Sequence, residues 1–243
     1  QSYLLSLDHF IVAKNIGIGL QCGVDQAGTG GLRTTIINPS IAYEAKLNRK
    51  TAMRIGVQPG VTIKSIQFDR LIFGDQISRG GNAGAASVTT VESPTQSRAF
   101  FDIGAGALIY NSNLWIGASF FHLNKPNESL YTNGGNVSIL PIKYSVHGGW
   151  KIVLDRDEKE RLVKKTITLV THYRAQAEFD QCDIGVYYTQ YGISGGLWYR
   201  GLPGIKKYKS GYKNDDAIAA VIGFQKKQLN IGYSYDFTIS QLF

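Results

Sequence analysis

Several features that mark other protein classes are scarce in this chain. Cysteine occurs only at Cys22 and Cys182, and charged residues make up 18% of the 243 residues. Two isolated cysteines give no zinc-binding spacing, so we expect two buried thiols, with a disulfide as the less favoured alternative. No stretch approaches the ~20 consecutive apolar residues of a membrane-spanning helix. The scarcity of long apolar runs therefore excludes a helical membrane protein.

Glycine and aromatic residues, by contrast, are abundant, with 28 Gly, 14 Tyr and 11 Phe. Plentiful aromatic and β-branched residues exclude a disordered chain, and abundant glycine excludes a long coiled coil. This profile favours an all-β fold of many strands. The net charge of +8 permits an acidic, lipid or nucleic-acid partner without selecting one. The densest basic stretch, residues 206–213, is interpreted as a solvated loop, so we expect no nucleic-acid partner.

Strand-like runs with strict alternation recur along the whole sequence. In residues 229–237 one face reads Leu, Ile, Tyr, Tyr, Phe and the other reads Asn, Gly, Ser, Asp. Successive side chains of a strand point to opposite faces, so such a run has one apolar face and one small, polar face. A tilted strand needs ~9–11 residues to cross a bilayer. We expect about twelve strands of this length or longer, near residues 2–11, 15–25, 33–47, 51–68, 99–110, 114–122, 136–152, 165–175, 181–190, 193–202, 216–225 and 229–240.

The connections between these runs alternate in length. Short turns are expected at 13–15, 48–50, 111–113, 191–192 and 226–228. Longer polar loops are expected at 26–32, 69–98, 123–135, 176–180 and 203–215, while the charged segment 155–161 takes a short-turn position. Outer-membrane barrels alternate short periplasmic turns with long external loops in this way. The sequence therefore predicts an all-β, transmembrane, antiparallel, up-and-down β-barrel.

The composition of the polar faces indicates which solvent the sheet meets. A soluble sheet would carry many Lys and Glu there, whereas these faces carry mostly Gly, Ser, Thr and Asn. Such faces suit a confined lumen, with the apolar faces in lipid. Aromatic residues gather towards the ends of the runs, as they do at membrane interfaces. The few charges that we expect to face the lumen include Arg54, Asp183, Arg200 and Asp236.

The direction of the first run bears on the number of strands. If the turn at 13–15 is periplasmic, twelve strands leave both chain ends outside, whereas bacterial barrels normally keep both ends in the periplasm. We therefore expect about fourteen strands in the full protein, with one before Gln1 and one after Phe243, in a single barrel domain that includes residues 1–243. The alternative, that Phe243 is the true end, stays open because barrels often finish in Phe.

The order and spacing of several segments resemble one family. Two of them are Gly196-Leu-Trp-Tyr-Arg200 and the alternating run 230–238, and the others are residues 2–9, 15–20, 101–110, 114–119 and 216–224. Together they resemble the PorP/SprF family of outer-membrane proteins of Bacteroidetes. The resemblance implies a multi-pass protein of the Gram-negative cell outer membrane, in contact with its lipid. It also implies that other type IX secretion system components and exported proteins are partners, and it implies a link to gliding motility.

The histidines do not indicate a metal or catalytic site. No metal-ligand spacing joins the four of them, which are His9, His122, His147 and His172. His147 and His172 fall on the polar faces of neighbouring runs, where lumenal hydrogen bonding explains them. No spacing selects a catalytic set of His172 with Ser145 or Asp183. We therefore expect no enzyme, no cofactor and no metal.

The connections carry the candidate contact surfaces. A loop as long as 69–98 is usually functional or disordered. We expect it to plug the lumen or to touch an exported protein, with Arg79, Asn82, Thr90 and Glu92 as candidate contacts. The charged turn is a candidate periplasmic contact through Asp155, Arg156, Glu158 and Arg161, with a plain solvated turn as the competing interpretation.

The function that these features favour is a non-catalytic outer-membrane barrel of the type IX secretion system. Such a barrel would dock or support the export and surface attachment of secreted proteins. The alternative is a passive porin or small-solute transporter on the same fold. A lipid-modifying enzyme is a third class, and it would require Ser, His and an acid clustered at one rim.

Overall fold

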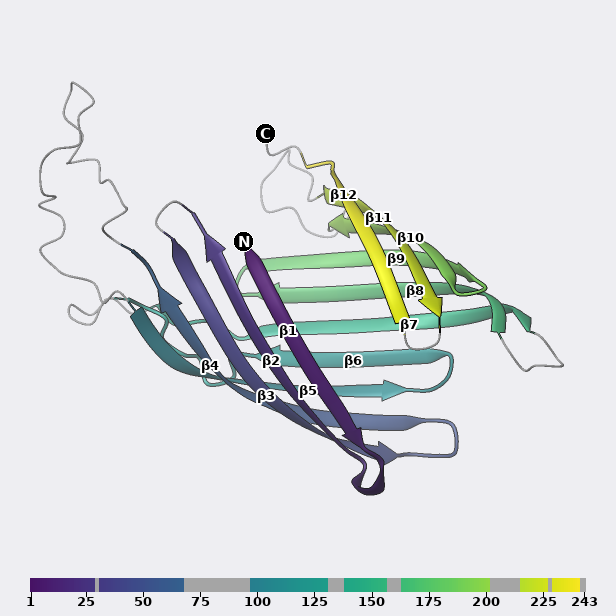
Figure 1. Cartoon of the computed structure of the whole chain (residues 1–243), viewed down its shortest axis with the longest axis horizontal. Coiled ribbons are helices and arrows are strands. Elements are labelled where there is room, and N and C mark those ends of the chain that lie inside the picture. The colour runs from purple at the N-terminus through teal and green to yellow at the C-terminus, as the bar shows by residue number, and fades with distance from the viewer. Residues whose placement is uncertain are drawn as a thin grey trace, which may run out of the picture. The chain divides into compact units, whose positions relative to one another are not determined.

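The computed structural model describes residues 1–28, 31–67, 97–130, 138–156, 163–201, 215–226 and 229–240. These residues form twelve antiparallel strands in one sheet, ordered along the sheet as they are along the chain (Figure 1). The strands are β1 (Ser2–Ile11), β2 (Ile16–Ala27), β3 (Leu32–Lys46), β4 (Ala52–Ser65), β5 (Ser97–Tyr110), β6 (Leu114–Phe121), β7 (Lys143–Arg156), β8 (Val163–Gln176), β9 (Phe179–Gln190), β10 (Ile193–Gly201), β11 (Asp215–Lys226) and β12 (Leu229–Thr238). The predicted all-β, antiparallel, up-and-down topology is confirmed. Within this part of the chain the ladder runs from β1 to β12, and its closure into a barrel stays a prediction.

Short turns predicted from the sequence are present with a local cause. Asn48 Oδ1 accepts hydrogen bonds from the backbone N–H groups of Lys50 and Thr51, each at 2.8 Å. Asn111 Oδ1 accepts in the same way from Asn113 and Leu114, at 2.8 and 2.7 Å. An asparagine that bonds to its own backbone a few residues on closes a tight turn. The first connection is a single 3-10 turn, Val12–Lys14, followed by Asn15 at a left-handed φ of 54°.

One connection differs from its predicted length. Residues 176–180 were expected to form a longer polar loop, but Gln176 pairs with Phe179 and only Ala177 and Glu178 lie between the strands. Ala177 has a φ of 52°, and positive φ in a two-residue connection matches the right-handed twist of the flanking strands. The polar composition of the segment concealed the turn, because alanine is not one of the residues that usually signal positive φ. The alternation of short and long connections is therefore interrupted here.

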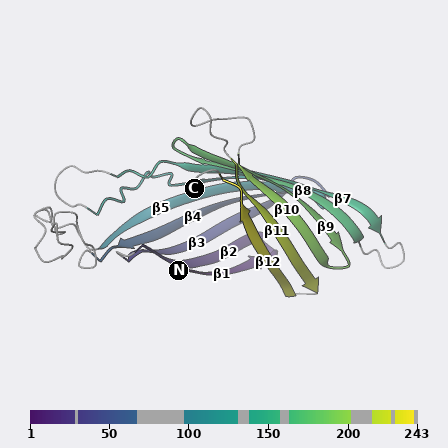
Figure 2. The ribbon, with the colours of Figure 1, turned by 90° about the horizontal axis from the view of Figure 1, so that it is seen from above.

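The contacts of the chain divide into two compact units. Unit 1 contains Gln1–Glu44, Ile55–Gly106 and Phe120–Ile142, and unit 2 contains Ala45–Arg54, Ala107–Ser119 and Lys143–Phe243. In unit 2, β7 to β12 lie side by side in chain order, as can be followed in Figures 1 and 2. The prediction of a single domain over residues 1–243 stays a prediction.

Burial on the strands is the reverse of that in a water-soluble sheet. On β9 the apolar side chains Ile184 and Val186 are 50% and 41% exposed, while Asp183, directly before Ile184 in sequence, is only 8% exposed. In the part of the chain that the structure describes, the buried apolar residues are three alanines, whereas the buried polar residues are Thr62, Ser129, Thr166 and Asp183. A soluble antiparallel sheet buries its apolar face and solvates its polar one. This sheet therefore presents its apolar face to the surroundings, as a strand-based membrane protein does.

Two further predictions concern helices and cysteines. Among the residues described here, no helix has the length and apolarity that would let it cross a membrane. Cys22 and Cys182 are free thiols, each half-buried. The expected pair of unlinked thiols is therefore present and the alternative of a disulfide is wrong, although the thiols are only partly buried.

Candidate functional site on the polar face

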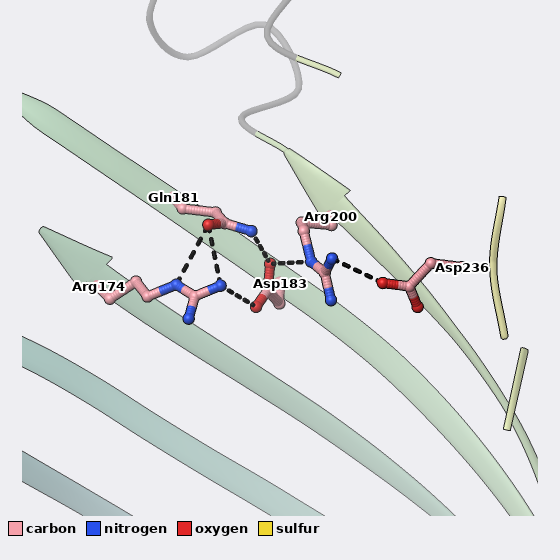
Figure 3. A network of polar contacts seen from close by, with 5 residues as sticks. All are labelled: Arg174, Gln181, Asp183, Arg200 and Asp236. Carbon is pink, nitrogen blue, oxygen red and sulfur yellow. Dashed lines mark hydrogen bonds and ion pairs between the residues drawn. The ribbon is translucent and has the colours of Figure 1, made fainter. Parts of the chain in front are cut away.

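A ladder of charged side chains crosses the polar face of unit 2 (Figure 3). Arg174 on β8 and Arg200 on β10 both approach Asp183 on β9, with Nη2–Oδ2 and Nε–Oδ1 distances of 3.6 and 3.8 Å. Arg200 Nη1 also donates to Asp236 Oδ2 on β12 at 2.9 Å. Gln181 joins the ladder because its Nε2 donates to Asp183 Oδ1 at 3.0 Å. The buried carboxylate of Asp183 thus interacts with two guanidinium groups, and the carboxylate of Asp236 interacts with one of them.

The sequence places these residues together through strand register. Arg174 lies opposite Gln181, and Arg200 lies opposite Asp183, so alternate positions of β8, β9 and β10 share one face. The strand between Arg200 and Asp236 contributes only small side chains, since Ala217 and Ala219 on β11 are 4% and 6% exposed. The long side chain of an arginine can lie along a small apolar surface such as a methyl group. The two alanines therefore let Arg200 reach across β11.

The four predicted lumen-facing charges do not form one cluster. Asp183, Arg200 and Asp236 belong to the ladder. Arg54 on β4 instead contacts Tyr110 on β5, with its Nη2 3.4 Å from the phenol oxygen and its Cζ 5.7 Å from the ring centroid. All four lie on the polar face by strand alternation, and whether that face lines a lumen stays a prediction.

Two members of the ladder were not among the predicted site residues. Strand alternation had already put Arg174 on the polar face, but nothing in the sequence marked it as paired. Gln181 lay at the edge of an expected loop, so its register opposite Arg174 was hidden. Recognition of the two-residue turn at Ala177 and Glu178 would have supplied both the register and the pair.

The predicted contact surfaces fall mostly outside the described residues. Arg79, Asn82, Thr90 and Glu92 of the long loop lie in segment 68–96, and Glu158 and Arg161 lie in segment 157–162, neither of which the structure describes. Asp155 is exposed near the end of β7, where it pairs in register with Lys165 on β8 at a β-bulge. Arg156 is the last residue of β7. The docking roles of these residues stay predictions.

The polar histidines predicted to be neighbours are adjacent. His147 and His172 are register partners on β7 and β8, with ring centroids 6.3 Å apart at an angle of 81°. His172 in turn lies opposite Asp183, and Ser145 exchanges a 2.9 Å hydrogen bond with Ser119. Over the described parts of the chain, no group of three or more His, Cys, Asp or Glu is arranged to hold a metal ion.

Aromatic rings cover glycines on the same polar face. Trp198 on β10 lies over Gly185 of β9, and Tyr187 of β9 lies over Gly196 of β10, so that the two rings meet edge to face with centroids 5.9 Å apart. Trp198 Nε1 donates to Tyr187 Oη at 2.6 Å. A Cβ atom added at Gly185 or Gly196 would lie 2.5 or 2.4 Å from ring atoms. The glycines therefore make room for rings that fill the polar face.

In unit 1 a connection is tied down on the polar face. We call the described residues 122–130 and 138–142, which follow β6, the strap. Glu128 of the strap pairs with Lys64 on β4, and the Ser129 carbonyl accepts a hydrogen bond from Arg98 Nη1 on β5 at 2.6 Å. At its start, His122 Nδ1 lies 2.8 Å from Asp102 Oδ2 on β5. Lys64, Arg98 and Asp102 all occupy polar-face positions of their strands, so the strap lies against that face.

The strap also has a regular internal structure. Asn127 Oδ1 accepts from the N–H groups of Ser129 and Ser138, at 3.0 and 3.1 Å. A backbone bridge pairs Asn127 with Ile139, and Leu140 N–H donates to the Pro126 carbonyl at 2.9 Å. A loop that bonds to itself and to two strands is a fixed part of the fold. The sequence predicted a polar loop at 123–135 and a strand from 136, but β7 begins only at Lys143, and the partners that hold residues 138–142 in the strap are distant along the chain.

The antiparallel strand order and the exposed apolar face define the class of this protein. It is a strand-based membrane protein whose polar face carries paired charges, rings in edge-to-face contact and a bound strap. A comparison with protein families matches the type IX secretion system membrane protein PorP/SprF family over residues 1–243, and the chain belongs to that family. A comparison with curated proteins finds no match. The family resemblance seen in the sequence is thereby confirmed.

Proposed function

We propose that this protein is a non-catalytic barrel of the Gram-negative outer membrane that docks other type IX secretion components and exported proteins. In this role it supports export and attachment of the exported proteins at the cell surface, and with them gliding motility. Family membership supports a part in the secretion machinery. The exposed apolar face supports the membrane location, since lipid is the solvent that such a face needs.

The observation that carries the docking role is the way the polar face is occupied. In unit 1 the strap is bound to β4 and β5, and in unit 2 rings and ion pairs cover the strands. Porins that conduct solutes keep a water-filled interior. A face that is covered by its own side chains supports a protein-binding scaffold better than a wide aqueous channel.

Co-purification tests the proposal directly. An affinity-tagged full-length protein is extracted from native membranes in mild detergent, and the bound proteins are identified by mass spectrometry. We expect other type IX secretion components and exported proteins to be enriched over an equally abundant tagged barrel of the same membrane. Recovery of lipid and lipopolysaccharide alone would contradict the docking role.

The passive porin remains the second candidate, because paired charges on a polar face also occur in solute channels. Conductance in planar bilayers separates the two. Docking with an occupied interior predicts no steady current, whereas a porin predicts a steady open current from single insertions.

A further inference from the structure

A cavity of about 340 Å³ opens at one end of β7, β8 and β9 in unit 2. Its lining includes Lys143, Arg174, Gln176, Phe179, Asp180 and Gln181. By strand alternation all of these except Asp180 point to the polar face, whereas Asp180 and a further lining residue, Ala175, belong to the opposite face. The cavity is therefore a feature of the polar side of the sheet, next to the charge ladder.

The two basic residues of the cavity differ in how they are held. Arg174 is fixed, because its Nε and Nη2 both donate to Gln181 Oε1, at 3.2 and 2.9 Å. Its Nη1 takes no part in those bonds. Lys143 begins β7 opposite Gln176, and no ion pair joins it to a carboxylate in the described parts of the chain. A guanidinium in a set orientation and an ammonium outside any ion pair of the described residues thus line the same space.

The carboxylates nearby already have partners, and one of these partners is Arg174 of the cavity itself. Asp183 is shared by Arg174 and Arg200, as the ladder in Figure 3 shows. Asp180, the one acidic residue named in the lining, accepts a 3.1 Å hydrogen bond from the hydroxyl of Tyr173. Of the two cations in the lining, Arg174 is therefore paired with Asp183, whereas Lys143 has no ion pair within the described residues. The cavity has the charge and the donors to receive an anion.

We propose that this cavity binds a carboxylate of a peptide, from an acidic side chain or a chain end of a docked protein. The inference rests on the proposed function and names the chemistry of the partner. Arg174 Nη1 and Lys143 Nζ donate to the carboxylate oxygens. Phe179, which is 76% exposed, offers an apolar surface beside them for the rest of the peptide. A lipid phosphate fits less well, because lipid meets the opposite, apolar face of these strands.

Peptide binding to the full-length protein in detergent tests the proposal. The probe is a fluorescein-labelled peptide of Glu, Gly and Phe, and its matched partner has Gln in place of every Glu. We expect the Glu peptide to bind and the Gln peptide to bind at least about fivefold more weakly, the size of effect that a partly exposed ion pair gives. Equal binding of the two peptides would overturn the proposal.

Variants locate the site. Lys143→Gln is expected to weaken binding of the Glu peptide about fivefold, and Lys143→Glu to reverse the preference in favour of a Lys-containing peptide. Lys226→Gln on β11 makes the same charge change outside the cavity and should leave binding unchanged. Heat-modified migration on gels, which reports folding of a barrel, is checked for each variant. Equal binding by wild type and Lys143→Gln, both folded, would also overturn the proposal.

Competition separates the possible sources of the anion. Phosphatidylglycerol vesicles that bind in a Lys143-dependent way and displace the peptide would assign the cavity to lipid and overturn the peptide proposal. Co-purification of secretion components is measured on the same Lys143→Gln variant. If those components are recovered from wild type while the Glu peptide does not bind it, only this inference fails and the docking function stands.

Discussion

Arg200 on β10 reaches over β11 to place its Nη1 2.9 Å from Asp236 Oδ2 on β12. This contact skips a whole strand, so it ties together two strands that share no backbone hydrogen bonds. The side chains of β11 permit this contact, because Ala217 and Ala219 are too small to block the path of Arg200. The Arg200–Asp236 contact thus depends on three strands, β10, β11 and β12, and not on one pair.

The two carboxylates of the ladder should differ in their contribution to stability. The side chain of Asp183 is 12% exposed and that of Asp236 is 45% exposed. Asp183→Asn leaves two guanidinium groups without their shared buried partner, and we expect it to lower the free energy of unfolding by about 3 kcal/mol. Asp236→Asn should lower it by at most about 1 kcal/mol. Urea unfolding in lipid vesicles measures both, and equal losses would contradict the burial argument.

Blocking the path of Arg200 over β11 should lower the free energy of unfolding by about as much as removing the carboxylate of Asp236. Ala219→Leu places a branched side chain where Arg200 crosses, so the Arg200–Asp236 contact is expected to be lost. The double variant Ala219→Leu with Asp236→Asn should then be less destabilised than the sum of the single variants. Ala220→Leu on the opposite, apolar face is the matched control and should be tolerated. Strict additivity in the double variant would show that the side chains do not interact.

The ring-covered glycines should not accept a methyl group. In Gly185→Ala and Gly196→Ala the new Cβ would lie 2.5 and 2.4 Å from ring atoms of Trp198 and Tyr187. Overpacking of this kind destabilises proteins by about 1–3 kcal/mol. Gly195→Ala is the control, because a Cβ at Gly195 meets nothing within 4 Å. The midpoint of urea unfolding should fall for the first two variants only, and a similar fall for Gly195→Ala would point to a backbone effect instead.

The strap should loosen when its ion pair is removed. Lys64→Gln or Glu128→Gln breaks the pair between the strap and β4. We expect amide hydrogen exchange at Glu128 and Leu140, which donate within the strap, to become about fivefold faster. Exchange at the Asn48–Thr51 turn should stay unchanged. The double variant Lys64→Glu with Glu128→Lys swaps the two charges, and partial restoration of protection in it would identify the ion pair as the cause. Unchanged exchange in the single variants would mean that the strap is held by its other bonds.

Much of the fold was predictable because the alternation of apolar and polar residues along a strand depends only on residues that are neighbours in the sequence. The runs at 181–190 and 229–240 gave strands, faces and the placement of Asp183 and Asp236 on a polar side. The site was only partly predictable, because its pairs depend on register between strands. A turn that depends on positive φ at Ala177 hid the pairing of Arg174 with Gln181. The strap was hidden for a related reason, since Glu128 meets Lys64 only after distant segments have folded together.

The chain carries three tryptophans, and strand alternation distributes them between the two faces. Trp115 and Trp198 lie over glycines on the polar face, whereas Trp150 is 54% exposed on the apolar face. Brominated acyl chains quench the fluorescence only of the indoles that they touch. They would therefore quench the fluorescence of Trp150 and leave that of Trp115 and Trp198 unchanged. The protein thus holds its own optical reporters, one for the apolar face and two for the polar face, without any added label.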